Sequence, residues 1–171
     1  IFVSTSPAIK NIHTAMLYPG TGLWEGIQVN EGRGSNKPFE QIGAPWINGE
    51  QLSDALGSIL QNVGISPVQY VPVVGVYANE CCQGITLNIM QPSAYMAVET
   101  GILTLQTIMQ LYPGETRERL YVTNANPTGE KHLDKLLGCV NAFERLKHQE
   151  NININVSGVW FDMIHPHLLY T

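Results

Sequence analysis

The sequence predicts an α/β or α+β fold, in which a small mixed sheet is packed by several helices within a single domain. Segments with apolar residues at helical spacing alternate with short segments of strand pattern, and no internal repeat interrupts them. The chain has 171 residues, of which 44% are hydrophobic. That length and composition suit one domain with a sizeable core.

A first helix is predicted to follow Ser6-Pro7, because this pair is typical of an N-cap and a first-turn proline. Apolar residues continue at helical spacing at Ile9, Ile12, Ala15 and Met16. The helix is expected to end before YPGTG (18–22), because proline and glycine favour turns. LWEGIQV (23–29) predicts a short strand, and PFEQIGAPW (38–46) predicts a second extended segment.

An apolar stripe with i, i+3, i+4, i+7 spacing predicts an amphipathic helix that ends before Gly64. Its members are Leu52, Ala55, Leu56, Ile59, Leu60 and Val63. VQYVPVVGV (68–76) and QGITLNIM (83–90) predict strands. Because proline cannot donate a ladder hydrogen bond, Pro72 places the first of these strands near an edge or a bulge.

The second half of the chain predicts mainly helices. A long helix is expected over about 93–111, where Pro113-Gly114 stops it. Shorter helices are expected around 130–137 and 140–148, and a last one over 157–164. NININV (151–156) predicts a weak strand or an extended connector.

Charge and composition exclude several classes of protein. The net charge is −5, the chain has no basic stripe, and nucleic acid and anionic membrane are therefore not expected partners. The uncharged run over 55–79 is broken by prolines and glycines, so it does not predict a membrane span. The chain begins without an initiator methionine or a signal peptide, which suggests that it starts partway through a longer protein.

Cysteines and histidines give no clear metal signature. Cys81, Cys82 and Cys139 are expected to be buried or free thiols, although a bond between Cys139 and one of the adjacent pair stays open. His165-Pro166-His167 has no acidic residue nearby and is interpreted as a surface pair. His132 is expected to pack or to face solvent. The chain also lacks a phosphate-binding loop and a serine-hydrolase elbow.

The densest charge lies in and beside a glycine-rich loop, QVNEGRGSNKPFEQIGAPW (28–46). Hydrolysis of a glycosidic bond needs two carboxyl groups, one protonated and one ionised, roughly 5–10 Å apart. Glu31 is a candidate for one of them. Asn30, Arg33 and Asn36 are candidates to bind hydroxyl groups or a carboxylate. The alternative is that Glu31 and Arg33 form a salt bridge that stabilises an Ω-type loop.

The same region carries a family resemblance. Residues 14–47 hold Tyr-Pro-Gly-Thr, Glu-Gly, Asn-Glu-Gly-Arg-Gly, Pro-Phe-Glu and Gly-Ala-Pro-Trp in this order. With this spacing they resemble the signature of the NamZ-type exo-β-N-acetylmuramidases, a glycoside hydrolase family formerly listed as a domain of unknown function. Weaker likeness continues through 70–89, 99–113, 132–138 and 167–170. The sequence departs from the family pattern at Ser35-Asn36-Lys37, where Thr-Thr-Arg is common, and at Gln83, where glycine is common.

The resemblance implies removal of terminal N-acetylmuramic acid from the non-reducing ends of peptidoglycan fragments, without a metal or organic cofactor. It corresponds to the family's C-terminal domain, so residues 1–171 are expected to be that domain. In such proteins an N-terminal Rossmann-like domain completes the cleft and carries a Glu-His-Gly element, which is absent from this chain. We therefore expect this N-terminal domain in cis or as another chain, and no activity without it. The family also favours a secreted or periplasmic location.

Carried over to this sequence, the resemblance implies that Glu31 is catalytic and that Arg33, Asn30, Glu40 and Asn36 bind the substrate. The guanidinium group of Arg33 suits the lactyl carboxylate of muramic acid, because a planar fork binds a carboxylate with two hydrogen bonds. The alternative is a non-catalytic carbohydrate-binding or structural domain that retains the fold.

Overall fold

Three strands form one antiparallel sheet in the computed structural model, which describes residues 2–152 and 158–168. The strands are β1 (Gln41–Ala44), β2 (Val63–Tyr70) and β3 (Cys82–Ile89), in the order β1–β3–β2. Ile85 of the central strand pairs with Ile42 on one side and with Pro67 on the other. The small sheet packed by helices confirms the predicted fold class, but both strand pairs are antiparallel, so the described sheet is not mixed as predicted.

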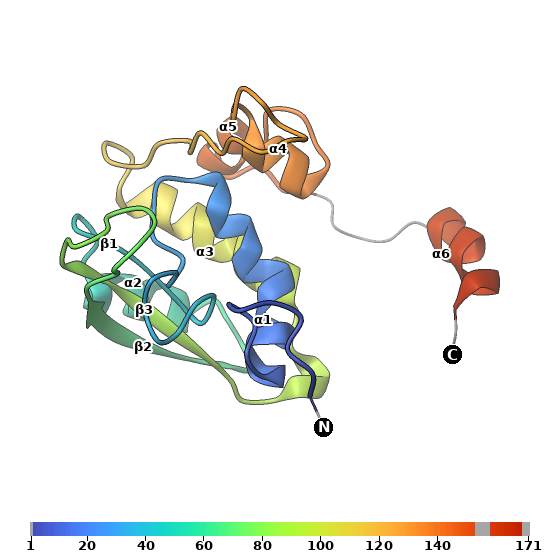
Figure 1. Ribbon diagram of the computed structural model, residues 1–171, viewed down its shortest axis with the longest axis horizontal. Coiled ribbons are helices and arrows are strands. Elements are labelled where there is room, and N and C mark those ends of the chain that lie inside the picture. Colours follow the sequence, from blue (N-terminus) through green and yellow to red (C-terminus); the bar gives the residue numbers. More distant parts are fainter. Residues whose placement is uncertain (1, 153–157, 169–171) are drawn as a thin grey trace.

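Helices lie beside this sheet and extend away from it, with α4 and α5 beyond α3 (Figure 1). The α-helices are α1 (Ile12–Thr21), α2 (Gly49–Gly57), α3 (Ala97–Leu111), α4 (His132–Leu137), α5 (Ala142–Lys147) and α6 (Gly158–Ile164). Short 3₁₀ segments are η1 (Gly22–Gly26), η2 (Pro92–Ala94) and η3 (His165–His167). Helix α2 packs against β2 and β3, while α3 packs against α1, α2 and α5. Figure 1 shows α6 apart from the rest of the molecule.

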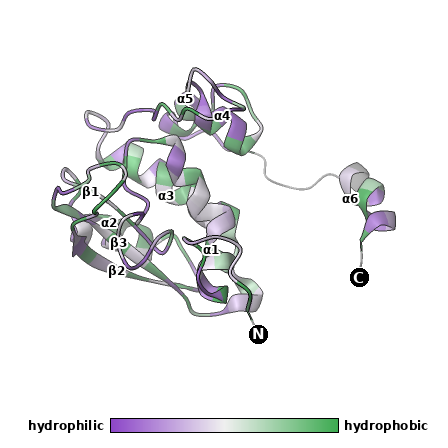
Figure 2. Ribbon diagram, in the orientation of Figure 1, coloured by the Kyte–Doolittle hydropathy of each residue, from purple (hydrophilic) through white to green (hydrophobic). Residues whose placement is uncertain are grey.

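The core joins the sheet to α1, α2 and α3. Its fully buried members include Leu17, Trp24, Ile42, Leu56, Ile85, Leu105 and Ile108. Figure 2 shows that hydrophobic residues recur along α3 and the strands, which is the pattern expected of elements with one buried face. Helices α1 and α3 come very close at Gly20. A Cβ atom at this position would lie 1.8 Å from the carbonyl oxygen of Ala97. Glycine at this position is therefore a packing requirement.

The first helix differs from its prediction at both ends. The N-cap is Asn11, whose side chain accepts a hydrogen bond from the backbone N–H of Thr14, whereas Ser6 caps only a local turn ending at Ile9. At the other end α1 continues through Pro19 and passes directly into η1. The strand predicted over 23–29 is wrong. Residues 22–26 form the 3₁₀ turn instead, and Ile27 makes only an isolated bridge to Glu118.

The amphipathic helix and the following strand exist, but their boundaries are shifted. Helix α2 ends at Gly57, and β2 begins at Val63. Val63 and Gly64 therefore belong to the strand and not to the end of the helix. Strand β2 lies at an edge of the sheet, as predicted, but Pro72, on which the prediction rested, lies beyond the strand. The proline within β2 is Pro67.

The prediction for the C-terminal half is largely confirmed. Helix α3 ends at Leu111 as expected and begins at Ala97 because η2 occupies residues 92–94. Helices α4, α5 and α6 lie within the predicted ranges. Of the segment 151–156, residues 153–156 lie outside the described part of the chain.

All three cysteines are free thiols. Within the described residues, no helix has the length and apolar character needed to cross a membrane.

Candidate functional site

The loop from residue 28 to residue 40 lies between η1 and β1 and is hydrogen-bonded to the edge of the sheet. Asn30 and Gly43 exchange backbone hydrogen bonds of 2.8 and 2.9 Å, and the N–H of Phe39 donates to the carbonyl oxygen of Glu31. Gly32 and Gly34 have φ values of 80° and 79°, which glycine adopts without strain. These two turns bring the side chain of Arg33 back over Glu31.

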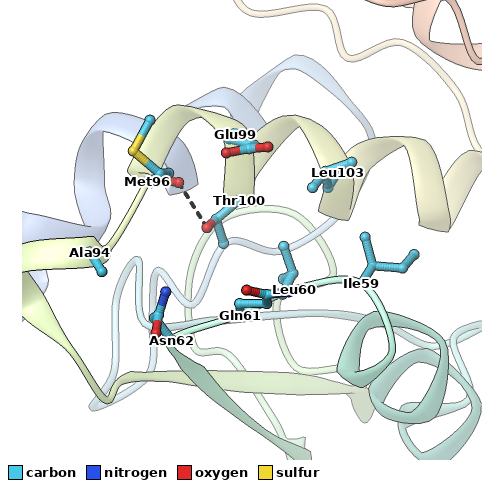
Figure 3. Close-up of a pocket in the computed structure, with 9 residues that line it drawn as sticks. All are labelled: Ile59, Leu60, Gln61, Asn62, Ala94, Met96, Glu99, Thr100 and Leu103. Atoms are coloured by element: carbon cyan, nitrogen blue, oxygen red, sulfur yellow. Dashed lines mark hydrogen bonds between the residues drawn. The ribbon is translucent and has the colours of Figure 1, made fainter.

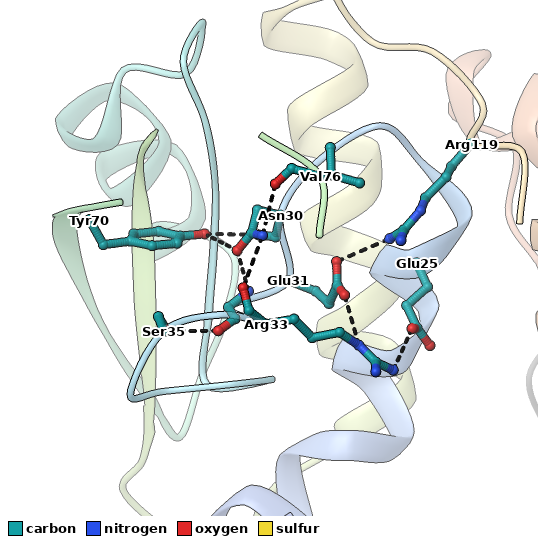
Figure 4. Close-up of polar contacts among 9 residues, drawn as sticks. Glu25, Asn30, Glu31, Arg33, Ser35, Tyr70, Val76 and Arg119 are labelled. Atoms are coloured by element: carbon teal, nitrogen blue, oxygen red, sulfur yellow. Dashed lines mark hydrogen bonds and ion pairs between the residues drawn. The ribbon is translucent and has the colours of Figure 1, made fainter. Parts of the chain in front are cut away.

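The Asn30 side chain holds the loop in shape and is 0% exposed. Its Nδ2 atom donates to the carbonyl oxygens of Arg33 at 3.2 Å and Val76 at 2.9 Å. Its Oδ1 atom accepts from the N–H of Gly32 at 2.9 Å and from the hydroxyl group of Tyr70 at 3.0 Å. Figure 4 shows these bonds converging on one amide group. They use the two donors and the two acceptor positions of the amide.

A chain of ion pairs runs through the centre of the loop, in the order Glu25, Arg33, Glu31, Arg119 (Figure 4). Nη2 of Arg33 lies 2.7 Å from Oε1 of Glu25, and Nε of Arg33 lies 2.9 Å from Oε1 of Glu31. Nη1 of Arg119 lies 3.1 Å from the other oxygen of Glu31. Both oxygens of Glu31 therefore face guanidinium groups.

Burial differs strongly along this chain. The side chain of Glu31 is 1% exposed, that of Arg119 is 15% exposed and that of Arg33 is 37% exposed. Burial raises the pKa of Glu31 above its ordinary value, and this effect outweighs the positive charges of Arg119 and Arg33, which act in the opposite direction. For Arg33, burial lowers the pKa, but Glu25, Tyr121 and Glu31 together outweigh burial, so the pKa is raised. Arg33 is thus a fixed cation at the surface above a buried acid.

Tyr121 and His132 border the ion pairs, and sequence analysis assigned neither of them to the site. The guanidinium group of Arg119 lies over the Tyr121 ring, 4.8 Å from its centroid. His132 stacks on the same ring with centroids 4.4 Å apart and an interplanar angle of 10°. Burial, followed by the charge of Glu25, raises the pKa of Tyr121, while burial lowers the pKa of His132. The site therefore extends from the loop to α4.

The remaining predicted residues lie away from the ion pairs. The Glu40 carboxylate accepts hydrogen bonds from Thr14 and, at 3.4 Å, from Asn11, so it lies at the first turn of α1. A negative charge there is favourable beside the positive end of the helix dipole. Asn36 lies exposed on the loop. Among the described residues, no group of three or more histidine, cysteine, aspartate or glutamate side chains could hold a metal ion.

Comparison with known proteins places this geometry in context. The family model described as exo-beta-N-acetylmuramidase NamZ, C-terminal, matches residues 16–160. The peptidoglycan beta-N-acetylmuramidase NamZ of Bacillus subtilis (strain 168) is 37% identical over 113 residues, which are 66% of this chain and 27% of that protein. This chain thus spans about a quarter of the length of that relative.

Two crystal structures of DUF1343 family proteins from Bacteroides fragilis are similar in fold. One superposes with a TM-score of 0.65 at 22% identity and covers 88% of this chain and 45% of the other. The second has a TM-score of 0.53 at 18% identity, with coverages of 96% and 43%. At this level of identity the likeness concerns the fold alone.

Proposed function

This chain belongs to the family of NamZ C-terminal domains, and on that premise we propose that it forms part of a peptidoglycan-directed glycosidase. The proposed reaction is the removal of terminal N-acetylmuramic acid from the non-reducing ends of peptidoglycan fragments. The proposal is supported by the name and similarity of the Bacillus subtilis relative. A further domain, attached or supplied as another chain, supplies the rest of the cleft and the second carboxyl group.

Arg33 is the residue whose geometry supports the proposal most directly. Its Nε and Nη2 atoms contact Glu31 and Glu25, and its side chain is 37% exposed. A guanidinium group has five N–H donors, so the two ion pairs leave donors for a ligand. Muramic acid differs from glucosamine by a lactyl ether that ends in a carboxylate. The proposed role of Arg33 is to bind this carboxylate from a position fixed in advance.

Glu31 has two possible roles in this proposal. A general acid must come within roughly 2.6–3.2 Å of the atom that it protonates. The side chain of Glu31 is 1% exposed, and both of its oxygens face guanidinium groups. This geometry favours a role in holding Arg33 and Arg119 in place. Its raised pKa is the property that favours the catalytic role. The catalytic role of Glu31 stays a prediction, which mutation of this residue tests.

The other predicted contacts have different support. Asn36 is exposed and free to meet a sugar hydroxyl group, so we retain it as a substrate-binding candidate. Asn30 and Glu40 act on the shape of the loop and on the start of α1 through the hydrogen bonds described above. A direct contact of either with the substrate stays a prediction.

The test is hydrolysis of a chromogenic β-N-acetylmuramic acid glycoside by the natural gene product that contains these residues. The matched substrate is the corresponding N-acetylglucosamine glycoside, which lacks only the lactyl group. We expect release of the chromophore from the first substrate and much less from the second. Failure to cleave either substrate, combined with measurable binding of muramic acid, would favour the non-catalytic carbohydrate-binding alternative. Failure to bind as well would reject both.

A further inference from the structure

The ring of Tyr121 links the chain of ion pairs to helix α4. The guanidinium group of Arg119 lies over this ring, 4.8 Å from its centroid, and His132 at the start of α4 stacks on it. A guanidinium group within about 6 Å of a ring centroid is attracted by the face of the ring. The same group contacts Glu31 through Nη1 at 3.1 Å (Figure 4). Arg119 therefore has two partners, a buried carboxylate and an aromatic ring.

The backbone of Tyr121 is held on both sides. Its N–H donates to the carbonyl oxygen of Gly129 at 2.8 Å, and its carbonyl oxygen accepts from Nδ2 of Asn126 at 3.3 Å. Asn126 is 4% exposed, and its Nδ2 atom also donates to the carbonyl oxygen of Glu130 at 3.2 Å. These bonds close the loop over 121–130. The ring consequently leaves its backbone at a fixed place and in a fixed direction.

Arg119 and His132 are attached to the same segment, η1. The N–H of Arg119 donates to the carbonyl oxygen of Gly26 at 3.0 Å. A Cβ atom at Gly26 would lie 2.6 Å from Cδ1 of Leu133, the residue after His132, so α4 packs directly on this segment. The cation and the two rings that contact one another are thus held on a common support.

The position of Arg119 matters because of what it does to Glu31. Burial disfavours the charged form of this carboxyl group, and the positive charge of Arg119 is the largest effect in the opposite direction. The other charged or titratable groups that face the carboxyl group are Arg33, Glu25 and Tyr70. An arginine side chain has many rotamers, so one that acts on a single carboxylate has to be held there by further contacts.

We propose that Tyr121 is a positioning residue, whose ring holds the guanidinium group of Arg119 against Glu31 while His132 holds the ring from α4. Tyr121 acts through Arg119 and not by contact with a substrate. Glu31 in turn holds Arg33 through the ion pair of 2.9 Å. The importance of this arrangement for hydrolysis rests on the proposed function, because there Arg33 binds the lactyl carboxylate.

The test is a ¹³C NMR titration of the Glu31 carboxyl carbon in the natural gene product that contains these residues, with Glu31→Gln to identify the signal. Tyr121→Leu removes the aromatic face. We expect it to raise the pKa of Glu31 by about 0.5–1, because a less fixed Arg119 stabilises the carboxylate less. Tyr121→Phe keeps the ring and should keep the wild-type titration. In the wild type, ring currents of Tyr121 should shift the side-chain protons of Arg119 upfield, a measurement that needs no variant.

The order of action is tested in a second background. With Arg119→Gln already present, Tyr121→Leu should have no further effect on Glu31, because the residue through which it acts is gone. The matched control is Leu103→Ala. Leu103 is half-buried and lines a cavity of about 270 Å³ between α3 and residues 59–62 (Figure 3). Among the residues described as lining this cavity, none belongs to the ion pairs, so the control loosens packing without moving the titration of Glu31.

The proposal is overturned if Tyr121→Leu leaves the pKa of Glu31 unchanged, or if the rise is the same in the Arg119→Gln background. It is also overturned if Leu103→Ala raises the pKa as much, or if the wild type shows no upfield shift of the Arg119 protons. None of these measurements uses a substrate. A failure here would therefore leave the proposed hydrolysis in place, and a lack of hydrolysis would leave this arrangement in place.

Discussion

The Nε atom of Arg33 lies 2.9 Å from Oε1 of Glu31, only two positions earlier in the chain, yet one side chain reaches the surface and the other is buried. The positive φ of Gly32 makes this reversal possible. The pair therefore links an interior acid to a cation that solvent or a ligand can reach. The salt bridge that the sequence offered as an alternative is present, and ligand binding by Arg33 stays a prediction.

Replacement of Glu31 by glutamine tests the buried half of the pair. The amide keeps the shape of the side chain, but its NH₂ group faces a guanidinium N–H, so one donor loses its acceptor. Because the burial cost of the carboxylate already offsets much of its attraction to the arginines, we expect a moderate loss of about 1–3 kcal/mol in unfolding free energy. Urea denaturation at pH 7 measures it.

Glu31→Ala is the matched comparison, because it removes both acceptors and leaves a cavity. Loss of one partner from a buried ion pair costs about 3–5 kcal/mol. If Glu31→Gln were as stable as the wild type, the carboxylate would not bind both arginines in solution. If Glu31→Gln abolished hydrolysis while the fold was retained, with muramic acid binding intact, the catalytic role would be supported.

Replacement of Arg33 by lysine tests the exposed half. A lysine keeps the charge but cannot contact Glu25 and Glu31 and still present a planar fork to a carboxylate. A hydrogen bond between charged groups contributes about 1.5–3 kcal/mol, so kcat/KM for the muramic acid substrate should fall about 10- to 100-fold. The glucosamine analogue has no carboxylate and should lose little. Equal losses on both substrates would remove Arg33 from recognition of the lactyl group.

The elements with strong local signals were predictable from the sequence. Pro113-Gly114 marks the end of α3 at Leu111, and the apolar stripe from Leu52 indicates α2. The region around Trp24 was not predictable, because its apolar pattern suits either a strand or a buried turn. The core of the structure selects the turn, in which Trp24 is fully buried.

The site was predictable only where its residues are neighbours in sequence. The spacing of Glu31 and Arg33 on a glycine-rich loop is enough to indicate a pair. Arg119 lies 88 positions from Glu31 and belongs to no motif, so its contact comes from the packing of distant segments. The pairing of Tyr121 with His132 likewise depends on the position of α4. The run of charged residues at 117–119 was the one available signal.

Glu118 is expected to make stability depend on pH. Its Oε1 atom is buried and has no hydrogen-bond partner among the described residues, and its pKa is raised above 4.5, first by burial and then by Asp134. A carboxyl group whose pKa is raised on folding favours the folded state while it is protonated. This contribution is complete below pH 4.5 and is lost as the pH rises through the pKa of the folded state.

Glu118→Gln mimics the protonated form and should therefore be more stable than the wild type at pH 7. The difference should shrink as the pH is lowered and vanish below about pH 4.5, where both side chains are neutral. Urea denaturation at a series of pH values measures this difference. Glu115→Gln serves as the control, because Glu115 is exposed and close in sequence. A constant difference across the pH range would show that the charge of Glu118 has no part in it.

Gly20 and Gly57 provide a matched pair for the packing of α1 on α3. Alanine is a better helix former than glycine by up to about 1 kcal/mol, which alone would favour either substitution. At Gly20 the new methyl group would meet the carbonyl oxygen of Ala97 at 1.8 Å, whereas at Gly57 no atom of the described part of the chain lies within 4 Å of it. Overpacking costs about 1–3 kcal/mol or more, so steric repulsion outweighs helix propensity at Gly20.

We expect Gly20→Ala to lower the midpoint of urea denaturation and Gly57→Ala to raise it slightly. Shifts in the same direction would mean that the two helices do not come this close, since propensity acts alike at both positions.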